Sequence, residues 1–139
     1  QLIGYSGNTG GSGGPHLHYE IRDGNQRPMN PLLFGINIQD TRKPEVDKLR
    51  IYKLDENAHI DHQDKAKDRR LTKQADGIYI AEKVEALGDI GIGIATFDRA
   101  NAVENKNGVY QLLLKVNGET HFEVKYDKFS FAETRSMTV

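Results

Sequence analysis

Cysteine is absent from this 139-residue sequence, which excludes disulfide bonds and thiolate metal sites. Any zinc ion would therefore depend on His, Asp and Glu side chains. Neither sign of charge is in excess, because 19 Lys and Arg residues stand against 20 Asp and Glu residues, and no basic stripe is interleaved with aromatic residues. This balance predicts no nucleic-acid partner. No apolar run approaches the roughly 18 residues of a membrane span.

The length and the start of the chain bound its organisation. The 139 residues suit one domain, or a small domain and a piece of another, and 37% hydrophobic residues are enough for a core. The chain begins at Gln1, within a pattern and without Met, so we expect a fragment of a longer protein. The lack of a visible signal peptide then indicates nothing about location.

Composition changes near residue 40. Residues 1–39 contain eight of the 14 glycines and three of the four prolines, which is typical of the closing strands of a loop-rich domain. Within them, the segment Pro31–Phe34 is compatible with a short turn of helix. The polar stretch from Ile38 to Val46 has the composition of a connector. We therefore expect two domains, residues 1–39 and residues 40–139.

The second domain is predicted to be a β-sandwich. The expected strands are Val46–Leu54, Arg69–Gln74, Gly77–Val84, Asp89–Phe97, Val109–Val116 and Thr120–Phe129. Short strands separated by turn residues, with no convincing helix, favour an immunoglobulin-like architecture. The predicted fold class is thus mainly β, with truncated strands of one domain followed by the sandwich. Fold class by itself implies no activity.

Two local patterns add detail to this prediction. Asn117-Gly118 separates two alternating segments and predicts a two-residue hairpin turn with positive φ. Ile90, Ile92 and Ile94 alternate with glycine, so we expect three isoleucines on a buried face and almost no side chain on the other. A neighbouring large side chain is expected to pack against that bare face.

The segment Gly13–Arg22, GGPHLHYEIR, alternates between two kinds of side chain. In an extended strand, successive side chains point to opposite faces. One face would carry Leu17, Tyr19 and Ile21, and the other His16, His18, Glu20 and Arg22. Two histidines on a polar strand face have three interpretations: metal ligands, acid–base groups, or residues of a solvated edge.

Three motifs near the N-terminus occur together: IGYSGNTG, GPHLHYE and PMNP. With them, residues 4–34 resemble the C-terminal part of the lysostaphin-like (LytM-type) zinc metallopeptidases, which cut peptide cross-links in bacterial cell walls. The resemblance covers about the first quarter of the chain. Gly13 departs from it, because many relatives have Thr there. Residues 40–139 are similar to a sandwich appended to envelope peptidases of this family.

The resemblance implies different roles for the two histidines. His18 corresponds to a zinc ligand, and His16 to a catalytic histidine near the zinc-bound water and the scissile carbonyl. Zinc would polarise that carbonyl and acidify its water, while His16 accepts or orients a proton. The implied substrate is a peptidoglycan peptide, and the implied location is the bacterial cell envelope, either periplasmic or membrane-associated.

The other zinc ligands of the family come from a His-Xaa-Xaa-Xaa-Asp motif, which would precede Gln1. His59 and His62 do not reproduce that spacing. One histidine cannot hold zinc tightly, so we expect this chain alone to be inactive and to need the missing N-terminal part of the peptidase domain. The strand Pro15–Ile21 would expose unpaired edges. It is therefore expected to pair with the sandwich, to pair with a second copy, or to lie disordered.

Some alternatives stay open at this point. The parent protein is either an enzyme or a non-catalytic, peptidase-like envelope adaptor whose sandwich binds a wall component or a protein partner. The stretch His59–Asp64 contains metal-ligand types but is interpreted as a solvated loop. The stretch Asp98–Asn107 is interpreted as a connecting loop rather than a calcium site, because it lacks the EF-hand pattern.

Overall fold

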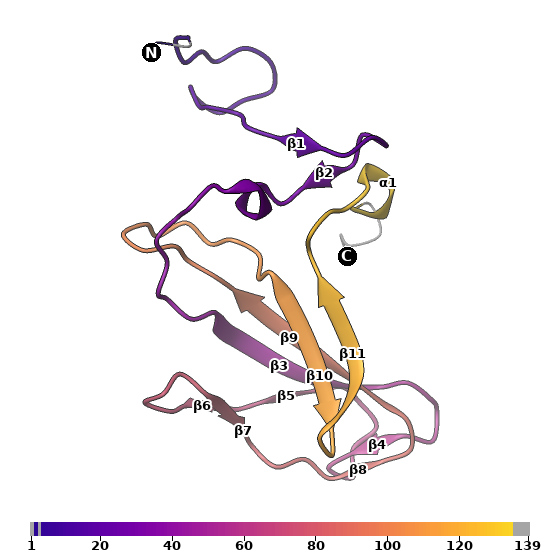
Figure 1. Ribbon diagram of the computed structural model, residues 1–139. Helices are drawn as coiled ribbons and strands as arrows, with labels where there is room; N and C mark the ends of the chain where they lie inside the picture. The colour runs from indigo at the N-terminus through magenta and orange to yellow at the C-terminus, as the bar shows by residue number, and fades with distance from the viewer. Residues whose placement is uncertain (1, 3, 135–139) are drawn as a thin grey trace. The chain divides into compact units, whose positions relative to one another are not determined.

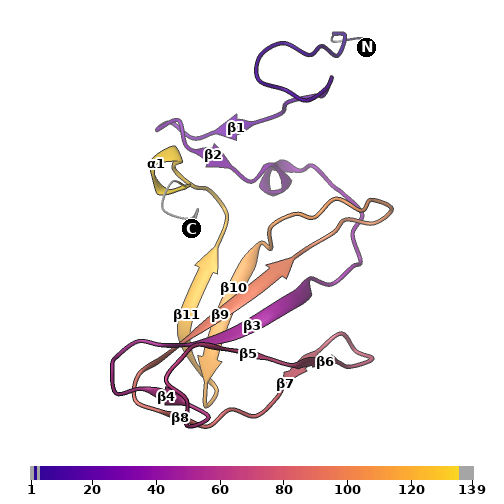
Figure 2. The same ribbon diagram turned by 180° about the vertical axis from the view of Figure 1, so that it is seen from behind.

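The structure is a computed structural model that describes residue 2 and residues 4–134 (Figures 1 and 2). It is mainly β, as the sequence predicts. The strands are β1 (Ile21–Arg22), β2 (Pro28–Met29), β3 (Glu45–Lys53), β4 (His59–Ile60), β5 (Lys67–Arg69), β6 (Leu71–Lys73), β7 (Tyr79–Ala81), β8 (Ala86–Leu87), β9 (Ile90–Phe97), β10 (Gln111–Val116) and β11 (Glu119–Lys125). The helices are the short 3-10 helix η1 (Pro31–Phe34) and α1 (Phe131–Thr134). No helix in the described part of the chain is long and apolar enough to cross a membrane.

The chain divides into two compact units. One contains the N-terminal residues as far as Asn37 together with the segment that begins at Val124, and the other runs from Ile38 to Glu123. The first break lies close to the expected boundary at residue 40. The division nevertheless differs from the expected one, because residues 40–139 do not all fall in the same unit.

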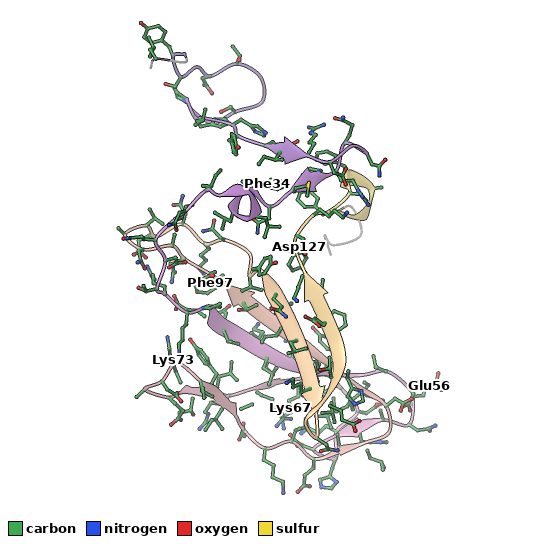
Figure 3. All side chains as sticks on the ribbon, viewed as in Figure 1. Phe34, Glu56, Lys67, Lys73, Phe97 and Asp127 are labelled. Carbon is green, nitrogen blue, oxygen red and sulfur yellow. The ribbon has the colours of Figure 1, made fainter. Side chains whose placement is uncertain are left out.

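Backbone pairing explains why the C-terminal segment joins the N-terminal unit. The Asn30 amide donates to the carbonyl oxygen of Asp127 at 2.8 Å, and the Phe129 amide donates to that of Pro28 at 3.2 Å. These bonds lie beside the antiparallel β1–β2 hairpin (Asp127 is labelled in Figure 3). A sequence reading that takes the strands in order does not predict such a return of the chain.

Asp23 organises the turn between β1 and β2. Its carboxylate accepts hydrogen bonds from the backbone amides of Asn25 and Arg27 at 2.9 and 3.0 Å, and from Arg27 Nε at 2.8 Å. The hydrogen bond from the Arg27 side chain is the main reason that the pKa of Asp23 is lowered to about 2. The Lys128 ammonium lies 3.8 Å from the same carboxylate, so Asp23 also links the C-terminal segment to the hairpin.

The short turn of helix that the sequence allows over Pro31–Phe34 is present as the 3-10 helix η1. The Asn30 side chain caps it by accepting from the Leu32 amide at 3.0 Å, and Pro31 occupies its first turn, where a missing amide hydrogen costs nothing. Gly35, with φ of 83°, ends it in the left-handed conformation. Local sequence alone accounts for this element.

The second unit is built around β3. This strand is the centre of a three-stranded sheet in the order β5-β3-β9, and it is antiparallel to both neighbours. The pairs β4–β8, β6–β7 and β10–β11 form separate two-stranded sheets. The buried apolar side chains of this unit, among the described residues, are Ile51, Ala58 and Ile60, and Arg69 is the buried charged residue. The core is therefore small.

The bare face of β9 is covered as predicted. A Cβ atom on Gly93 would lie 2.7 Å from Cε2 of Tyr52, and a Cβ atom on Gly91 would lie 3.2 Å from Cδ2 of Leu54. Large side chains from β3 and the residue that follows it therefore fill the space that the two glycines leave. The prediction that a large neighbour packs closely against this face is confirmed.

The isoleucine face of β9 differs from the prediction. Ile92 and Ile94 are 51% and 46% exposed, although Ile51, the cross-strand partner of Ile92, is only 3% exposed. The difference arises because β3 has a strand on each side, whereas β9 is the last strand of its sheet in the described part of the chain. The expected burial of these two isoleucines is wrong.

The predicted hairpin turn at Asn117-Gly118 is confirmed. Asn117 has φ of 52° and Gly118 has φ of 88°, and the turn joins the paired strands β10 and β11. Two consecutive left-handed residues are what a type I′ turn requires, and they match the twist of the flanking strands.

Candidate functional site

The histidine-rich segment lies in the first unit and is less regular than expected. Of the predicted strand Pro15–Ile21, only Ile21 lies in a strand, and His16 forms an isolated antiparallel bridge with Gly7. Leu17 and Tyr19 are 82% and 58% exposed. An extended segment needs a neighbouring strand for its backbone hydrogen bonds, and the described residues supply only the Gly7 bridge. The prediction of a strand over this segment is therefore wrong.

The His16 ring is held by hydrogen bonds within its own loop. Its Nδ1 lies 2.9 Å from the carbonyl oxygen of Gly14 and 3.0 Å from the hydroxyl of Ser12. The Ser12 hydroxyl donates to the same carbonyl at 2.7 Å, and it accepts from the Gly14 amide at 3.2 Å. A carbonyl oxygen only accepts, so the Gly14 contact requires a proton on Nδ1. In the neutral ring, Nε2 is then the basic nitrogen.

His18 lies beside an anchored carboxylate. Its Nε2 is 3.4 Å from Oε2 of Glu20, and its side chain is 74% exposed. The hydrogen bond from Arg22 lowers the pKa of Glu20 below its ordinary value, and His18 adds to the effect. Glu20 is therefore an ionised acceptor near neutral pH. A carboxylate that holds the ring of a histidine is the usual companion of a metal-ligating imidazole.

The donor set around His18 does not fit a complete zinc site. A catalytic zinc ion takes about three protein ligands and a water molecule. The part of the chain that the structure describes contains no group of three or more His, Asp or Glu residues arranged to hold a metal ion. His18 can supply one ligand, and a complete catalytic site would need further ligands from outside the described residues.

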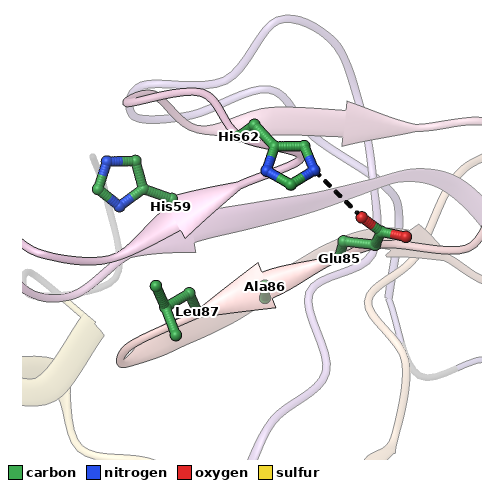
Figure 4. A pocket seen from close by; sticks show the side chains of 5 residues that line it. All are labelled: His59, His62, Glu85, Ala86 and Leu87. Atoms are coloured by element: carbon green, nitrogen blue, oxygen red, sulfur yellow. Dashed lines mark ion pairs between the residues drawn. The ribbon is translucent and has the colours of Figure 1, made fainter.

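A second candidate site lies in the other unit, where β4 pairs with β8. A pocket of about 410 Å³ is lined by His59, His62, Glu85, Ala86 and Leu87 (Figure 4). The Nε2 atom of His62 lies 3.3 Å from Oε2 of Glu85, as the dashed line in Figure 4 marks. His59 Nδ1 lies 2.8 Å from a carbonyl oxygen two residues earlier, which again requires a proton on Nδ1.

Asp61 fixes the turn that presents His62. Asp61 and His62 have φ of 48° and 61°, and the amides and carbonyls of Ile60 and Gln63 bond to each other at 3.0 Å in both directions. This is the pattern of a two-residue hairpin turn without glycine. Lys67 donates to the Asp61 carboxylate at 2.9 Å. That hydrogen bond is the main cause of the lowered pKa of Asp61.

The sequence did not predict this pocket. His59 and His62 are exposed, as expected of a solvated loop, but Ile60 between them is fully buried. Two-residue strands and a hairpin turn that lacks Asn-Gly leave no periodic pattern to recognise. The two exposed rings and Glu85 border an open pocket, but they do not form a group arranged to hold a metal ion, and this arrangement does not indicate a particular reaction.

The loop between Asp98 and Asn107 agrees with its interpretation as a connector. The two residues exchange backbone hydrogen bonds at 2.9 and 2.8 Å, which closes the loop at its base. The carboxylate of Glu104 lies 3.7 Å from both Arg42 and Arg99. This acidic side chain therefore faces arginines, an arrangement that does not favour calcium.

Comparison with known proteins adds no further support. No family model matches this chain, and no curated protein or solved structure matches it significantly. The likeness of the N-terminal motifs to LytM-type peptidases therefore stays a prediction from the sequence.

Proposed function

We propose that this chain belongs to a cell-envelope zinc metalloendopeptidase that hydrolyses peptide cross-links of peptidoglycan. In this proposal His16 is the catalytic histidine and His18 is one of the zinc ligands. The observation that carries the proposal is the position of Nδ1 of His16 near the Gly14 carbonyl, because it directs the proton to one nitrogen of the ring. His59 also has Nδ1 near a carbonyl two residues earlier, but His16 is held in addition by the Ser12 hydroxyl.

The restraint on His16 suits acid–base chemistry. With its proton on Nδ1, the neutral ring offers Nε2 as an acceptor, and Nε2 is the nitrogen that lies away from the loop carbonyl. Ser12 and Gly14 hold the ring without supplying a charge. The ring would accept a proton from, or orient, a water molecule at the scissile peptide.

The glycines around His16 leave room for a substrate. A Cβ atom on Gly11, Gly13 or Gly14 would meet no other atom within 4 Å. An extended peptide could approach this backbone closely, because no side chain stands in its way. The same openness fits a substrate recognised through its main chain, such as a wall peptide.

The metal part of the proposal requires residues beyond those described. His18, with the ionised Glu20 beside it, supplies one ligand, and the described residues offer no second and third. The remaining ligands would come from a preceding part of the peptidase domain. The isolated chain is therefore proposed to be inactive.

The first experiment measures release of peptides from peptidoglycan by the isolated chain at saturating zinc. We expect no release above the background of buffer with zinc. Measurable turnover would contradict the proposal that this chain lacks a complete site.

The second experiment uses the parent protein purified with its metal. His18→Ala is expected to lose bound zinc as well as turnover, whereas His16→Ala keeps the zinc and loses at least about a hundredfold in kcat. His121→Ala, a change at an exposed histidine of β11, is the matched control and should leave both unchanged. Full zinc occupancy in His18→Ala would contradict the ligand assignment. A parent protein that binds no metal and releases no peptide would support the non-catalytic adaptor instead.

A further inference from the structure

The C-terminal segment pairs with the hairpin that follows the two histidines. Lys128 forms an antiparallel bridge with Met29, and the Phe129 amide donates to the carbonyl oxygen of Pro28 at 3.2 Å. Pro28 is in turn the cross-strand partner of Arg22. Figures 1 and 2 both show α1 beside the β1–β2 hairpin. The backbone therefore brings the two ends of the described chain together around Arg22.

Phe131, the first residue of α1, places its ring against the side chain of Arg22. The Arg22 guanidinium carbon lies 5.4 Å from the centroid of this ring, which is within the range of a cation–π contact. The Phe129 ring meets Phe131 edge-on, with 6.1 Å between the ring centroids and an angle of 86° between the ring planes. Because Phe129 is bonded to the strand opposite Arg22, the aromatic pair is tied to the hairpin at both of its members.

Arg22 connects this aromatic pair to the candidate site. Its Nε forms an ion pair with Oε1 of Glu20, and the other carboxylate oxygen, Oε2, lies 3.4 Å from Nε2 of His18. An ionised carboxylate only accepts, so in the neutral ring this contact places the proton on Nε2 and leaves Nδ1 of His18 as the nitrogen for a metal ion. The contacts thus run from Phe131 through Arg22 and Glu20 to His18.

We propose that Phe131 is a positioning residue of the candidate site: its ring holds the Arg22 side chain, and Arg22 keeps Glu20 in place beside His18. The proposal rests on the proposed function, because His18 is the zinc ligand in it. A carboxylate that fixes the ring of a ligating histidine affects metal affinity without touching the metal. The C-terminal segment then contributes to a site whose ligand lies near the start of the chain.

The exposure of these side chains indicates positioning rather than core packing. Phe131 is 53% exposed and the Arg22 side chain is 44% exposed, so neither belongs to the core. The Glu20 side chain, on which His18 and Arg22 converge, is only 22% exposed. A long arginine side chain has many rotamers in water, and an aromatic ring against its guanidinium restricts them. Restricting Arg22 also restricts the carboxylate that pairs with it.

Nuclear magnetic resonance of the isolated chain tests these contacts without zinc or substrate. The Phe131 ring should shift the signal of the Arg22 Nε proton through its ring current. Phe131→Ala should remove that shift and should move the His18 ring signals toward those of the exposed His121. Phe131→Tyr keeps an aromatic ring and should retain both features. Phe34→Ala, at an aromatic residue of the same unit that is 49% exposed, is the matched control and should change neither.

The Asn30 amide shows whether the C-terminal segment stays attached, because it donates to the carbonyl oxygen of Asp127. In Phe131→Ala this amide should keep its protection from hydrogen exchange, so that a change at His18 reports the lost ring and not a released segment. If the protection is lost, Phe131→Leu, which keeps apolar bulk without an aromatic ring, replaces it under the same criterion. Unchanged His18 signals in the variant with a protected Asn30 amide would overturn the proposal.

Zinc binding by the parent protein measures the consequence at the site. Phe131→Ala is expected to weaken zinc binding up to about fivefold, which is the range for an exposed cation–π contact. Arg22→Ala should weaken it more, because Glu20 then loses its ion pair. The double variant should bind zinc as well as Arg22→Ala does, since the ring acts through Arg22, and additive losses would contradict this route.

The two kinds of measurement separate this proposal from the proposed function. A parent protein that binds no zinc would overturn the proposed function and, with it, the role of Phe131 toward zinc. The spectra of the isolated chain would still show whether Phe131 holds Arg22. Conversely, a parent protein that binds zinc equally well with and without the Phe131 ring would overturn only the positioning role.

Discussion

The Arg69 guanidinium forms an ion pair with the Asp61 carboxylate, and this contact ties the His62 turn to strand β5. Arg69 is only 6% exposed, and its Nε is buried without a hydrogen-bond partner among the described residues. The same carboxylate accepts from the Glu85 amide at 3.1 Å. Asp61 therefore connects β4, β5 and the start of β8, and it supplies the negative charge next to a buried cation.

Replacing Asp61 is expected to destabilise the second unit. Asp61→Asn keeps the shape of the side chain but removes the negative charge, which leaves the buried Arg69 cation uncompensated. The midpoint of thermal unfolding should fall clearly more than in the control Asp47→Asn, a change at an exposed carboxylate of β3. Equal midpoints in the two variants would show that the ion pair does not stabilise the fold.

The pH dependence of stability is expected to follow the lowered pKa values of Asp23 and Asp61. Each folded-state pKa lies below the unfolded value of about 3.9, so the stabilising contribution is complete above about pH 4 and is lost as the pH falls toward the folded-state value. For Asp23, that loss extends to about pH 2.

Urea unfolding at a series of pH values measures this dependence. The contribution of these two carboxyls to the free energy of unfolding should stay constant from neutral pH to about pH 4. It should decrease at lower pH. Asp61→Asn should make this decrease at low pH (the acid limb) shallower, because one of the two carboxyls with a lowered pKa is gone. An acid limb that is unchanged in Asp61→Asn would assign the effect to other carboxyls.

The longer strands whose side chains alternate along the sequence could be predicted from the sequence. β3, β9 and β10 lie within two residues of their expected positions, and the Asn117-Gly118 turn joins β10 and β11 as predicted. These segments encode their structure locally through period-two patterns and a turn that demands positive φ. β4 and β8 have two residues each and depend on contacts distant in sequence, so no local pattern reveals them.

The sequence names the residues of the candidate site through its motifs, and their chemistry stays a prediction, whereas their geometry could not be predicted. Motifs around His16 and His18 indicate which residue types matter, but the strand expected to carry them lacks the neighbours that would complete its backbone pairing. The role of Ser12 in holding His16 depends on a loop conformation that alternation does not encode. The same limit applies to Asp61, whose partners Lys67 and Arg69 lie in another strand.

The contact between Gly93 and Tyr52 predicts a measurable coupling. Gly93→Ala places a Cβ atom 2.7 Å from Cε2 of Tyr52, so the ring must move, and we expect a loss of about 1–3 kcal/mol in the free energy of unfolding. In the Tyr52→Ala background the clash is absent, and the same glycine change should cost less by about 0.5 kcal/mol or more. Equal costs in the two backgrounds would contradict the predicted packing.

The tautomer of His16 tests the arrangement on which the proposed function depends. Nitrogen-15 correlation spectra distinguish a proton on Nδ1 from a proton on Nε2, and we expect neutral His16 to carry it on Nδ1 because the Gly14 carbonyl can only accept. His121, an exposed residue of β11, is the reference for an unrestrained ring.

Ser12→Ala separates the two contacts of this ring. The variant removes the hydroxyl that lies 3.0 Å from Nδ1 of His16 but leaves the Gly14 carbonyl in place. The proton should therefore stay mainly on Nδ1, while the ring signals move toward those of His121, because the loop loses the bonds between Ser12 and Gly14. If His16 of the unmodified chain instead carries its proton on Nε2, the Gly14 contact is not a hydrogen bond. The basic nitrogen then lies on the wrong side of the ring for the proposed role.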